Sequence, residues 1–524
     1  MSRLTRMVKA PMMDTALGYL YAPLYPLVQR MRLVRRSGRR HDPADILLPD
    51  GYVAEVVATG LNAPVHCCFD DEGFCYVSEC GHKIESKPRI LRVDVYSGDT
   101  EVFFDLPEDR WRIEGAFTGA CWLGGRLYFA NTDAISRLEP DGRIEDIVTG
   151  LPWGDHMTNY PVAGPDGKLY WGQGSTTNSG VVGGDNYSYE WLREFPGLHD
   201  VPATDVALAG RNYEFADVLG GLGRTVRTGA YVPFGTETAP GQVVPGDTKC
   251  SGAILRCNPD GSDLEVVAWG LRNPFGTAFH PDGRLLATNH GIDERSARYV
   301  VAARDDLYEI DDGAWYGWPD FSSGIRLDDP SWPAGRGQEP VLADHPDPDP
   351  PKPAVTFEPH AAANGLDVSR DPAFGFVGNA FVALYGDVFP VTTRAKTPVG
   401  YKVVRVDLQT GTVVDFAVNK LAGPASKLPH RGLERPSHCQ FGPDGALYVV
   451  DWGQISLAPE VGGIRMPLGT GTLWRIRRTG EQAGERPPTP VEVPMRALAM
   501  ALAAGGLAAA GSAVLLGRRR RRRK

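Results

Sequence analysis

The sequence lacks several patterns that would point to other fold classes. No Cys-x-x-Cys pair occurs among its 8 cysteines, which argues against a zinc ribbon or a thioredoxin-like redox motif. Long amphipathic helical patterns are scarce in the middle of the chain, which disfavours two α/β domains. The 524 residues are 42% hydrophobic and include 62 Gly and 43 Pro, a composition that provides a large core and many turns. We therefore expect an all-β body of about 430 residues.

The N-terminal segment lacks the features of a cleavable signal peptide. Three basic residues precede an apolar stretch at 15–28, but two prolines interrupt this stretch and no small-x-small cleavage site follows it. A second basic cluster follows instead, with six arginines between positions 30 and 40. A segment that lies on anionic lipid is equally consistent with this pattern. We assign residues 1–45 to a basic, partly apolar N-terminal segment.

A repeated hairpin phrase runs through the rest of the chain. Six times an apolar run is cut by a Gly-containing turn, often Asp-Gly, and resumes as a strand. Asp-Gly is a strong hairpin signal, because Gly adopts the positive φ of the turn without strain. The copies lie at residues 69–79, 121–131, 163–172, 279–289, 376–386 and 441–453. Such repeated hairpin units are typical of a β-propeller, and six copies predict six blades.

A second phrase, similar to Gly-Leu-x-x-Pro, precedes several of these copies. It occurs at residues 59–64, 149–154, 269–274 and 431–436. Phrases at equivalent blade positions lie on the same rim, so we expect them to converge at one end of the central channel. Loops on a rigid scaffold often carry chemistry. The alternative is that the phrase contributes only turn geometry.

The C-terminal end differs from the body. Residues 497–517 carry no charge, and seven basic residues follow at 518–524. A span of this length crosses a bilayer, so we predict a transmembrane helix over 496–517. A Pro-rich linker over 479–495 would connect it to a propeller over 46–478. By the positive-inside rule the basic tail is cytoplasmic, and the propeller lies on the extracytoplasmic face of the cell membrane.

Charge is divided between the ends and the body. Residues 1–40 and 496–524 each carry a net charge of +8, and the whole chain carries −9, so residues 41–495 carry −25. A body this acidic repels nucleic acid, and the basic ends therefore indicate a membrane rather than DNA or RNA. The even number of cysteines fits an oxidising compartment, where they would form disulfides or remain buried small hydrophobic residues.

Three phrases carry a family resemblance. They read WGDHMTNYPVAGPDGKLYWGQG from residue 153, WGLRNPFGTAFHPDG from residue 269 and DDLYEIDDGAWYGWPDF from residue 305. They resemble the soluble glucose/sorbosone dehydrogenases, which bind pyrroloquinoline quinone (PQQ) on a six-bladed propeller. The resemblance spans about residues 50–478. It implies a quinoprotein that oxidises a sugar, either an aldose or a sorbosone-like aldehyde, by hydride transfer to PQQ; with the predicted C-terminal helix, this quinoprotein would be membrane-anchored. The final electron acceptor is unknown.

The resemblance implies catalytic roles for His156 and Arg272. His156 lies eight residues before GPDG and corresponds to the family's general base, a task that suits an imidazole with a pKa near ~6.5. Arg272 would bind the quinone oxygen, because a guanidinium is a fixed cation that stabilises developing negative charge. Asn273 would contact the edge of the cofactor.

Further cofactor and metal positions follow from the same resemblance. Glu114, His290 and Arg435 match positions near the cofactor or substrate. The main-chain carbonyls of Gly291 and Ile292 match a calcium site, since calcium accepts oxygen ligands in irregular geometry. The nearby carboxylates of Asp293, Glu294 and Asp306 would add metal ligands. Alternatively, they would form ion pairs with Arg295 and Arg298.

Two positions depart from the family pattern. Ser175 stands where an acidic residue usually orients the catalytic histidine, and Asp155 is a candidate substitute. Ser437 stands where the second of two paired arginines is expected, while Arg435 matches the first. An insertion over 175–249 would form a lid, a polar substrate wall or an ordinary loop.

Two other functions stay open. The first is a non-catalytic, surface-displayed propeller that binds a glycan or a protein, which the two serines favour. The second is a calcium-dependent lactonase, in which Glu, Asn and Asp side chains hold a central metal that activates water. The GLRNP and YGWP phrases have no obvious role in a lactonase site.

Overall fold

The structure is a computed structural model of the chain. It describes residues 39–81, 86–107, 117–186, 191–220, 223–296, 298–333, 337–388, 397–458 and 463–479. The predicted transmembrane helix at 496–517, most of the predicted linker and the basic tail lie outside the described residues. In the part of the chain that is described, no helix is long and apolar enough to cross a membrane.

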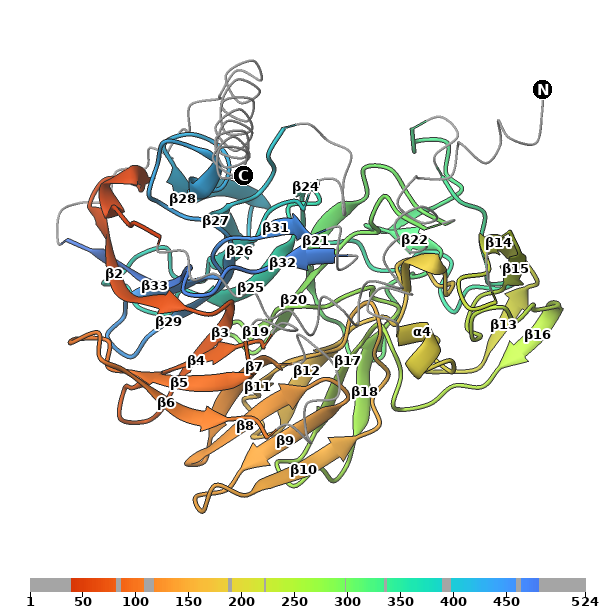
Figure 1. The fold of residues 1–524 in the computed structure, drawn as a ribbon, viewed down its shortest axis with the longest axis horizontal. Coiled ribbons are helices and arrows are strands. Elements are labelled where there is room, and N and C mark those ends of the chain that lie inside the picture. Colours follow the sequence, from red (N-terminus) through yellow and green to blue (C-terminus); the bar gives the residue numbers. More distant parts are fainter. Residues whose placement is uncertain are drawn as a thin grey trace, which may run out of the picture.

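Six antiparallel sheets form the blades of a propeller (Figure 1). The first blade contains β3 (Pro64–Phe69), β4 (Cys75–Glu79), β5 (Arg89–Val93) and β6 (Thr100–Asp105). The second contains β7 (Phe117–Leu123), β8 (Arg126–Asn131), β9 (Ala134–Leu138) and β10 (Ile144–Thr149). The third contains β11 (Thr158–Ala163), β12 (Leu169–Gln173), β17 (Ala253–Cys257) and β18 (Glu265–Trp269).

The remaining three blades continue the ring. The fourth contains β19 (Thr277–Phe279), β20 (Leu285–Asn289), β21 (Arg304–Glu309) and β24 (Val355–Pro359). The fifth contains β25 (Ala363–Val368), β26 (Ala380–Leu384), β27 (Lys402–Asp407) and β28 (Thr412–Asn419), with the short β1 (Ile46–Leu47) added at its edge. The sixth contains β29 (Pro436–Phe441), β30 (Leu447–Asp451), β33 (Gly471–Arg478) and β2 (Tyr52–Leu61).

The innermost strands of the six blades contact one another in a closed ring, in the order β3, β7, β11, β19, β25 and β29. Each predicted hairpin phrase joins the first two strands of one blade. In the Asp-Gly copies the turn glycine has a positive φ, as at Gly167 (77°), Gly283 (97°) and Gly445 (74°), the conformation that Gly adopts without steric cost. The prediction of an all-β, six-bladed propeller is confirmed.

The ring is closed by strands from opposite ends of the described chain. In the sixth blade β2 lies at the outer edge and pairs with β33 in antiparallel register, with Tyr52 opposite Arg478. The residues just before β1 also pack on this blade. The Arg39 guanidinium, with an exposed side-chain fraction of 4%, forms an ion pair with Asp451 at 2.7 Å. Arg39 therefore belongs structurally to the propeller.

Several short elements lie between the blade strands. A 3₁₀ turn (Pro43–Asp45) precedes β1, and another (Ala425–Lys427) precedes β29. The hairpin β22 (Phe321–Ser322) and β23 (Ile325–Arg326) lies between β21 and β24, and β31 (Ser456–Ala458) with β32 (Gly463–Arg465) lies between β30 and β33.

The long insertion in the third blade is a packed lobe. It contains helix α4 (Trp191–Glu194), the pair β13 (Val206–Ala209) and β16 (Pro240–Val244), and the pair β14 (Tyr213–Ala216) and β15 (Thr225–Thr228). Its buried Val206, Leu208 and Tyr231 share one core cluster with Trp171 and Trp269 of the blade. A shared core of this kind fixes the lobe against the propeller.

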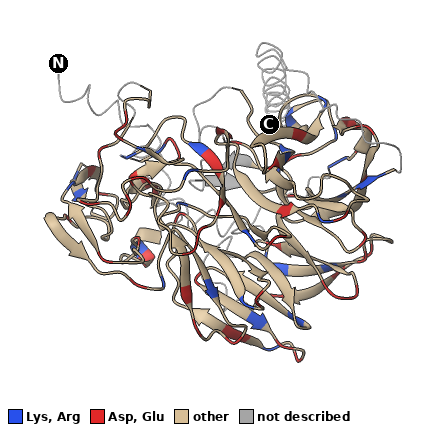
Figure 2. Cartoon of the chain, turned by 180° about the vertical axis from the view of Figure 1, so that it is seen from behind, with Lys and Arg blue, Asp and Glu red and all other residues tan. Residues whose placement is uncertain are grey.

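All eight cysteines are buried and none forms a disulfide. They act as small hydrophobic residues of the core, one of the two alternatives left open above. Figure 2 shows acidic and basic residues interspersed along the blade strands. Cross-strand ion pairs account for part of this pattern, such as Arg137 with Glu145 at 2.9 Å and Arg475 with Glu55 at 2.6 Å.

Candidate active site

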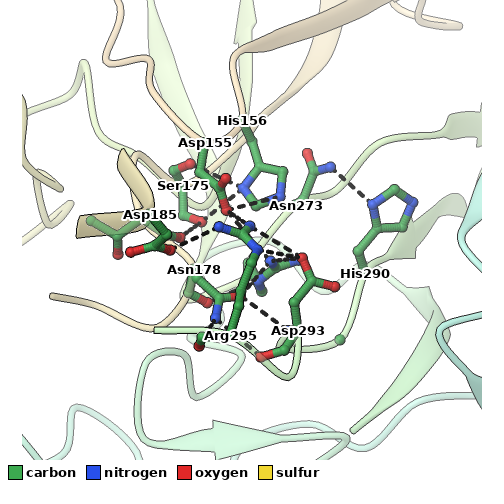
Figure 3. Close-up of polar contacts among 12 residues, drawn as sticks. Asp155, His156, Ser175, Asn178, Asp185, Asn273, His290, Asp293 and Arg295 are labelled. Carbon is green, nitrogen blue, oxygen red and sulfur yellow. Dashed lines mark hydrogen bonds and ion pairs between the residues drawn. The ribbon is translucent and has the colours of Figure 1, made fainter. Parts of the chain in front are cut away.

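The candidate site is built from loops at one end of the ring. His156 lies in the loop between β10 and β11, and Arg272 lies in the equivalent loop between β18 and β19. His290 and Asp293 follow β20, while Ser175 follows β12. These loops connect either two blades or the middle strands of one blade, which places them on the same rim. The expected convergence at one end of the channel is found for these residues (Figure 3).

The His156 loop is held by main-chain hydrogen bonds to the segment after β12. The His156 amide donates to the Ser175 carbonyl at 3.0 Å, and the Asp155 amide donates to the Thr176 carbonyl at 2.8 Å. A Cβ atom on Gly154 would lie 2.5 Å from the Thr176 oxygen. Glycine is therefore required at 154 for the two segments to approach this closely.

The His156 imidazole is oriented through its Nδ1 atom. Nδ1 lies 3.1 Å from the Ser175 carbonyl oxygen and 3.2 Å from the Ser175 Oγ. Nε2 lies 3.8 Å from Asp155 Oδ2, which is beyond hydrogen-bonding distance. Burial, reinforced by the positive charge of Arg272, lowers the pKa of His156 to about 3. The ring is therefore neutral at pH 7 and able to accept a proton.

Two sequence phrases pack together to position Arg272. In the WGLRNP phrase, the Trp269 and Gly270 carbonyls accept hydrogen bonds from the Tyr316 and Trp318 amides of the YGWP phrase, at 2.7 and 2.6 Å. Gly270 has a φ of 76°, and a Cβ there would lie 2.3 Å from the Trp315 ring. The two phrases thus form one packed unit next to Arg272.

The Arg272 guanidinium is buried and surrounded by acceptors. Its Nε donates to the Asn178 carbonyl at 2.9 Å, and its NH2 group donates to Asn178 Oδ1 at 2.7 Å. The NH2 group also lies 3.2 Å from Asp293 Oδ2 and 3.6 Å from Asp155 Oδ2. Arg272 is therefore fixed before any ligand binds, which reduces the reorganisation needed during a reaction.

Asn273 and His290 form a second oriented pair. His290 Nε2 lies 2.9 Å from Asn364 Oδ1, and because this oxygen is assigned as an acceptor, the ring proton is placed on Nε2. His290 Nδ1 is then an acceptor, and the Asn273 amide group donates to it at 3.0 Å. Burial lowers the pKa of His290, so this ring is also neutral. Asn159 of β11 donates to Asn273 Oδ1 at 3.1 Å and connects the third and fourth blades.

Arg295 gathers three carboxylates, as Figure 3 shows. It contacts Asp155, lies 2.8 Å from Asp185 and lies 3.1 Å from Asp293. Burial opposes ionisation of Asp155, but the positive charges of Arg295 and Arg272 outweigh it and help to lower the pKa of Asp155 to about 2. Burial raises the pKa of Asp185. We call Arg272, Arg295, Asp155, Asp185 and Asp293 the ionic cluster; its two cations face three carboxyl groups.

The predicted calcium position lies beside this cluster. The Gly291 amide donates to Asp305 Oδ1 at 2.7 Å, and the Ile292 side chain is buried in a small apolar cluster. No described residue donates a hydrogen bond to the Gly291 or Ile292 carbonyl oxygen. Glu294 lies 3.5 Å from His360 Nε2. Among the described residues, no group of three or more His, Cys, Asp or Glu side chains is arranged to hold a metal, so main-chain carbonyls would have to supply ligands.

Other predicted carboxylate contacts differ from the structure. Asp293 does pair with Arg295, whereas Arg298 pairs with Asp320 at 2.6 Å, away from the ionic cluster. Asp306 accepts a hydrogen bond from Ser323 at 2.8 Å, and it is the neighbouring Asp305 that contacts the Gly291 loop. Adjacent strand residues point to opposite faces, so sequence proximity alone did not distinguish these two.

Arg435 belongs to a separate group on the sixth blade. Its guanidinium donates to the Gly386 and Asp387 carbonyls at 3.0 and 3.1 Å and lies over the rings of Tyr385 and Tyr401. No described contact joins Arg435 to Arg272 or His156. Ser437 is fully buried, and its hydroxyl lies 3.1 Å from the Pro64 carbonyl, to which it donates. Ser437 thus connects the sixth and first blades and is not a cation in the site.

Sequence reasoning assigned Glu114 to the site, but this residue lies outside the described residues. It did not assign Asp185 or Arg295, which take part in most of the ion pairs of the cluster, or Asn178, which accepts two hydrogen bonds from Arg272. Asn178 and Asp185 come from the insertion, in the polar phrase TTNSGVVGGDN at 176–186. From the sequence, a polar wall of the substrate site was one prediction for the insertion. The polar composition of this phrase was the only feature of the sequence that pointed to Asn178 and Asp185 as site residues.

The comparisons with known proteins agree with this fold. Residues 248–457 match the family model described as Glucose / Sorbosone dehydrogenase. Quinoprotein glucose dehydrogenase B from Acinetobacter calcoaceticus is 23% identical over 303 residues, which cover 52% of this chain and 53% of that protein. The match thus spans about half the length of this curated relative.

Solved structures are similar over most of the chain. The holo PQQ domain of pyranose dehydrogenase from Coprinopsis cinerea has a TM-score of 0.52 and 16% identity, covering 84% of this chain and 98% of that chain. PQQ-bound aldose sugar dehydrogenase from Streptomyces coelicolor has a TM-score of 0.47 and 18% identity, covering 82% and 99%. The first of these likenesses establishes the shared fold.

Proposed function

We propose that the protein is a membrane-anchored, PQQ- and calcium-dependent dehydrogenase that oxidises an aldose or a related sugar aldehyde, a proposal supported by the match of residues 248–457 to the Glucose / Sorbosone dehydrogenase family model. One observation carries the proposal: the neutral His156 imidazole and the buried Arg272 guanidinium lie on either side of the same carboxylate oxygen, with Asp155 Oδ2 3.8 Å from His156 Nε2 and 3.6 Å from the Arg272 NH2 group. A base and a fixed cation are the two groups that hydride transfer from a hydroxyl carbon requires.

The donor set of the site fits an anionic quinone cofactor. Arg272, Asn273 and Arg435 offer nitrogen donors, and the buried Nε of Arg435 has no hydrogen-bond partner among the described residues. A guanidinium suits carboxylate and quinone oxygens because its donors are planar and permanently charged. These residues would hold the cofactor, with Arg435 approaching from the sixth blade.

The charge balance supports a metal as well. The ionic cluster contains two cations and three carboxyl groups, Asp155, Asp185 and Asp293, and PQQ would bring further carboxylates. A divalent cation would offset this excess of negative charge. The carbonyl oxygens of Gly291 and Ile292, to which no described residue donates a hydrogen bond, are ligands that calcium accepts.

The residues of the chain divide the proton and charge work between them. His156 Nε2 takes the proton of the sugar hydroxyl, because Nδ1 is already engaged with Ser175. When bound, PQQ supplies the quinone that accepts the hydride. Arg272 keeps its charge and stabilises negative charge that develops near it. Asn273 and His290 hold each other in one orientation and limit the positions that a bound group can take.

We further propose that the uncharged stretch at 496–517 anchors the protein, with the propeller on the extracytoplasmic face. The seven basic residues that follow it support this orientation. Removing residues 496–524 should move the protein from the membrane fraction to the supernatant. If this variant still sediments with membranes, the proposed anchor is wrong.

Titration of the full-length protein in detergent with PQQ and calcium tests the enzymatic proposal. Binding is followed by absorbance, and activity by reduction of an artificial dye with a panel of sugars. The proposal predicts saturable PQQ binding and dye reduction that is lost in His156→Ala and retained in the control His280→Ala, which lies in the turn between β19 and β20 at the other end of the fourth blade. No binding at micromolar PQQ would overturn it in favour of a displayed binding propeller. Lactone hydrolysis with calcium alone would overturn it in favour of a lactonase.

A further inference from the structure

Ser175 occupies a position from which it controls the protonation pattern of His156. Both of its oxygens face His156 Nδ1, the carbonyl at 3.1 Å and the hydroxyl at 3.2 Å. The side chain of Ser175 is completely buried, so water does not compete for these contacts. The two atoms come from one residue, and a single substitution therefore removes one acceptor and keeps the other.

The direction of the hydrogen bonds can be assigned from the surroundings. The Ser175 hydroxyl donates its only proton to the Thr177 carbonyl at 2.7 Å. It can then only accept from His156, and a carbonyl oxygen also only accepts. Two acceptors at Nδ1 require that Nδ1 carries the proton, which leaves the Nε2 lone pair free. Asp155 Oδ2 lies 3.8 Å from Nε2, beyond hydrogen-bonding distance, and has no proton to offer when ionised.

The Ser175 segment is itself fixed by a buried carboxylate. Asp200 accepts from the Thr176 amide at 2.6 Å, from Thr177 Oγ1 at 2.6 Å and from Ser251 Oγ at 3.0 Å. The Ser175 amide donates to the Arg272 carbonyl at 2.7 Å. The two Ser175 oxygen atoms that face His156 are therefore held from both sides. Asp200 does not contact the imidazole itself and acts on it only through the Ser175 segment.

We propose that Ser175 is a positioning residue that fixes the Nδ1-protonated tautomer of His156 and so makes Nε2 the basic atom, with Asp200 holding the Ser175 segment in place. The inference rests on the proposed function only in taking His156 as the base. A neutral acceptor also suits this site electrostatically, because a carboxylate at 175 would add a fourth acid to the region of Asp155, Asp185 and Asp293, where charges of like sign repel.

The tautomer can be measured without any cofactor. Nitrogen NMR of protein labelled at the histidine imidazole nitrogens distinguishes protonated from unprotonated ring nitrogens, and His156→Gln identifies the signal among the 11 histidines. In the wild type we expect a protonated Nδ1 and an unprotonated Nε2. In Ser175→Ala, where only the carbonyl acceptor remains, we expect a mixture of tautomers, and Ser97→Ala on an exposed turn should leave the signal unchanged.

Kinetics gives the second readout. Ser175→Ala should lower kcat about 3- to 10-fold, as expected for one lost hydrogen bond, with KM within about twofold because substrate contacts are not altered. Asp200→Asn should act in the same direction. A wild-type His156 protonated at Nε2, or a Ser175→Ala protein with unchanged tautomer and kcat, would overturn the inference. If the tautomer behaves as expected but PQQ does not bind, the proposed function fails and the positioning role stands.

Discussion

The imidazole rings of His66 and His438 lie face to face in the middle of the propeller, with their centroids 4.0 Å apart and their planes inclined by 33°. They come from β3 and β29, two neighbouring innermost strands, and Tyr160 of β11 packs against both. Burial lowers the pKa of His66 well below its usual value and that of His438 to about 3. Two imidazoles can stack this closely only while at least one is neutral.

The pair predicts loss of stability in acid. In the unfolded chain each histidine binds a proton near pH ~6.5, whereas in the folded protein both histidines resist protonation. The free energy of unfolding is therefore at its full value above that pH. Below it, the free energy of unfolding falls by up to about 1.4 kcal/mol per pH unit for each histidine. His438→Phe should flatten the dependence of the urea midpoint on pH between about 7 and 5. The control His199→Gln, at a half-buried position in the insertion, should show the wild-type slope; an equally steep slope in His438→Phe would contradict the prediction.

Gly365 makes room for His438. A Cβ at this position would lie 1.9 Å from His438 Nδ1, and both residues are on innermost strands that cannot separate without opening the ring. We expect Gly365→Ala to lower the free energy of unfolding by about 3 kcal/mol through overpacking. Gly197→Ala is the matched control, because nothing lies within 4 Å of its added Cβ. Similar unfolding midpoints for the two variants would show that the channel can relax.

Arg295 should be important for stability as well as for the site. Arg295→Met leaves Asp155, Asp185 and Asp293 without their shared cation, and breaking a buried ion pair from one side costs about 3–5 kcal/mol. The cost should shrink below about pH 4, as the acids become protonated. The exposed pair of Arg326 with Asp328 at 2.7 Å provides the control, since Arg326→Met should cost less than about 1 kcal/mol. Chemical denaturation at two pH values measures both.

The Arg39 contact predicts where the stable domain begins. Arg39→Met leaves Asp451 buried without its ion-pair partner, and we expect a loss of about 3–5 kcal/mol. Arg40→Met, one residue away and exposed, should leave the unfolding midpoint nearly unchanged. Equal midpoints for the two variants would support the boundary at residue 46 that the sequence suggested.

The pH dependence of catalysis should reflect the buried base. Because the pKa of His156 is about 3 in the free protein, kcat/KM should show no decline between about pH 8 and 5 from this residue. Arg272, Arg295 and His290 oppose its protonation, and Asp155 favours it. Ser175→Asp adds a carboxylate at Nδ1 and should move the acidic limb upward. A wild-type inflection near pH 6.5 would mean that the base is more exposed than its surroundings indicate.

The blades were predictable from the sequence because their signals are local. Turn glycines and alternating apolar residues lie within about a dozen positions of one another, and the six hairpin phrases coincide with the first two strands of the six blades. His156, Arg272, Asn273 and His290 were assigned through phrases whose spacing is preserved. Their convergence at one end of the channel was predictable because loops at equivalent positions of different blades lie on the same rim.

The ionic cluster was not predictable in the same way. Arg295 meets Asp155 across 140 positions and Asp185 across 110 positions of sequence, and no local pattern encodes such contacts. The choice of Asp305 over Asp306 depends on which face of β21 each residue occupies. Arg39 lies in a basic segment that composition assigns to the surface, yet its partner Asp451 is buried in the sixth blade.

The pairing of β2 with β33 sets an order of events during synthesis. Apart from the short β1, the ribosome delivers β2 before any other strand of the ring, while its partner β33 comes after β30 in the last blade. The strand therefore waits unpaired, with its backbone groups open to solvent or to other chains, until almost the whole propeller has been made. Ring closure is a late, long-range step, and conditions that slow translation near β33 should prolong the interval in which the nascent protein is prone to aggregate.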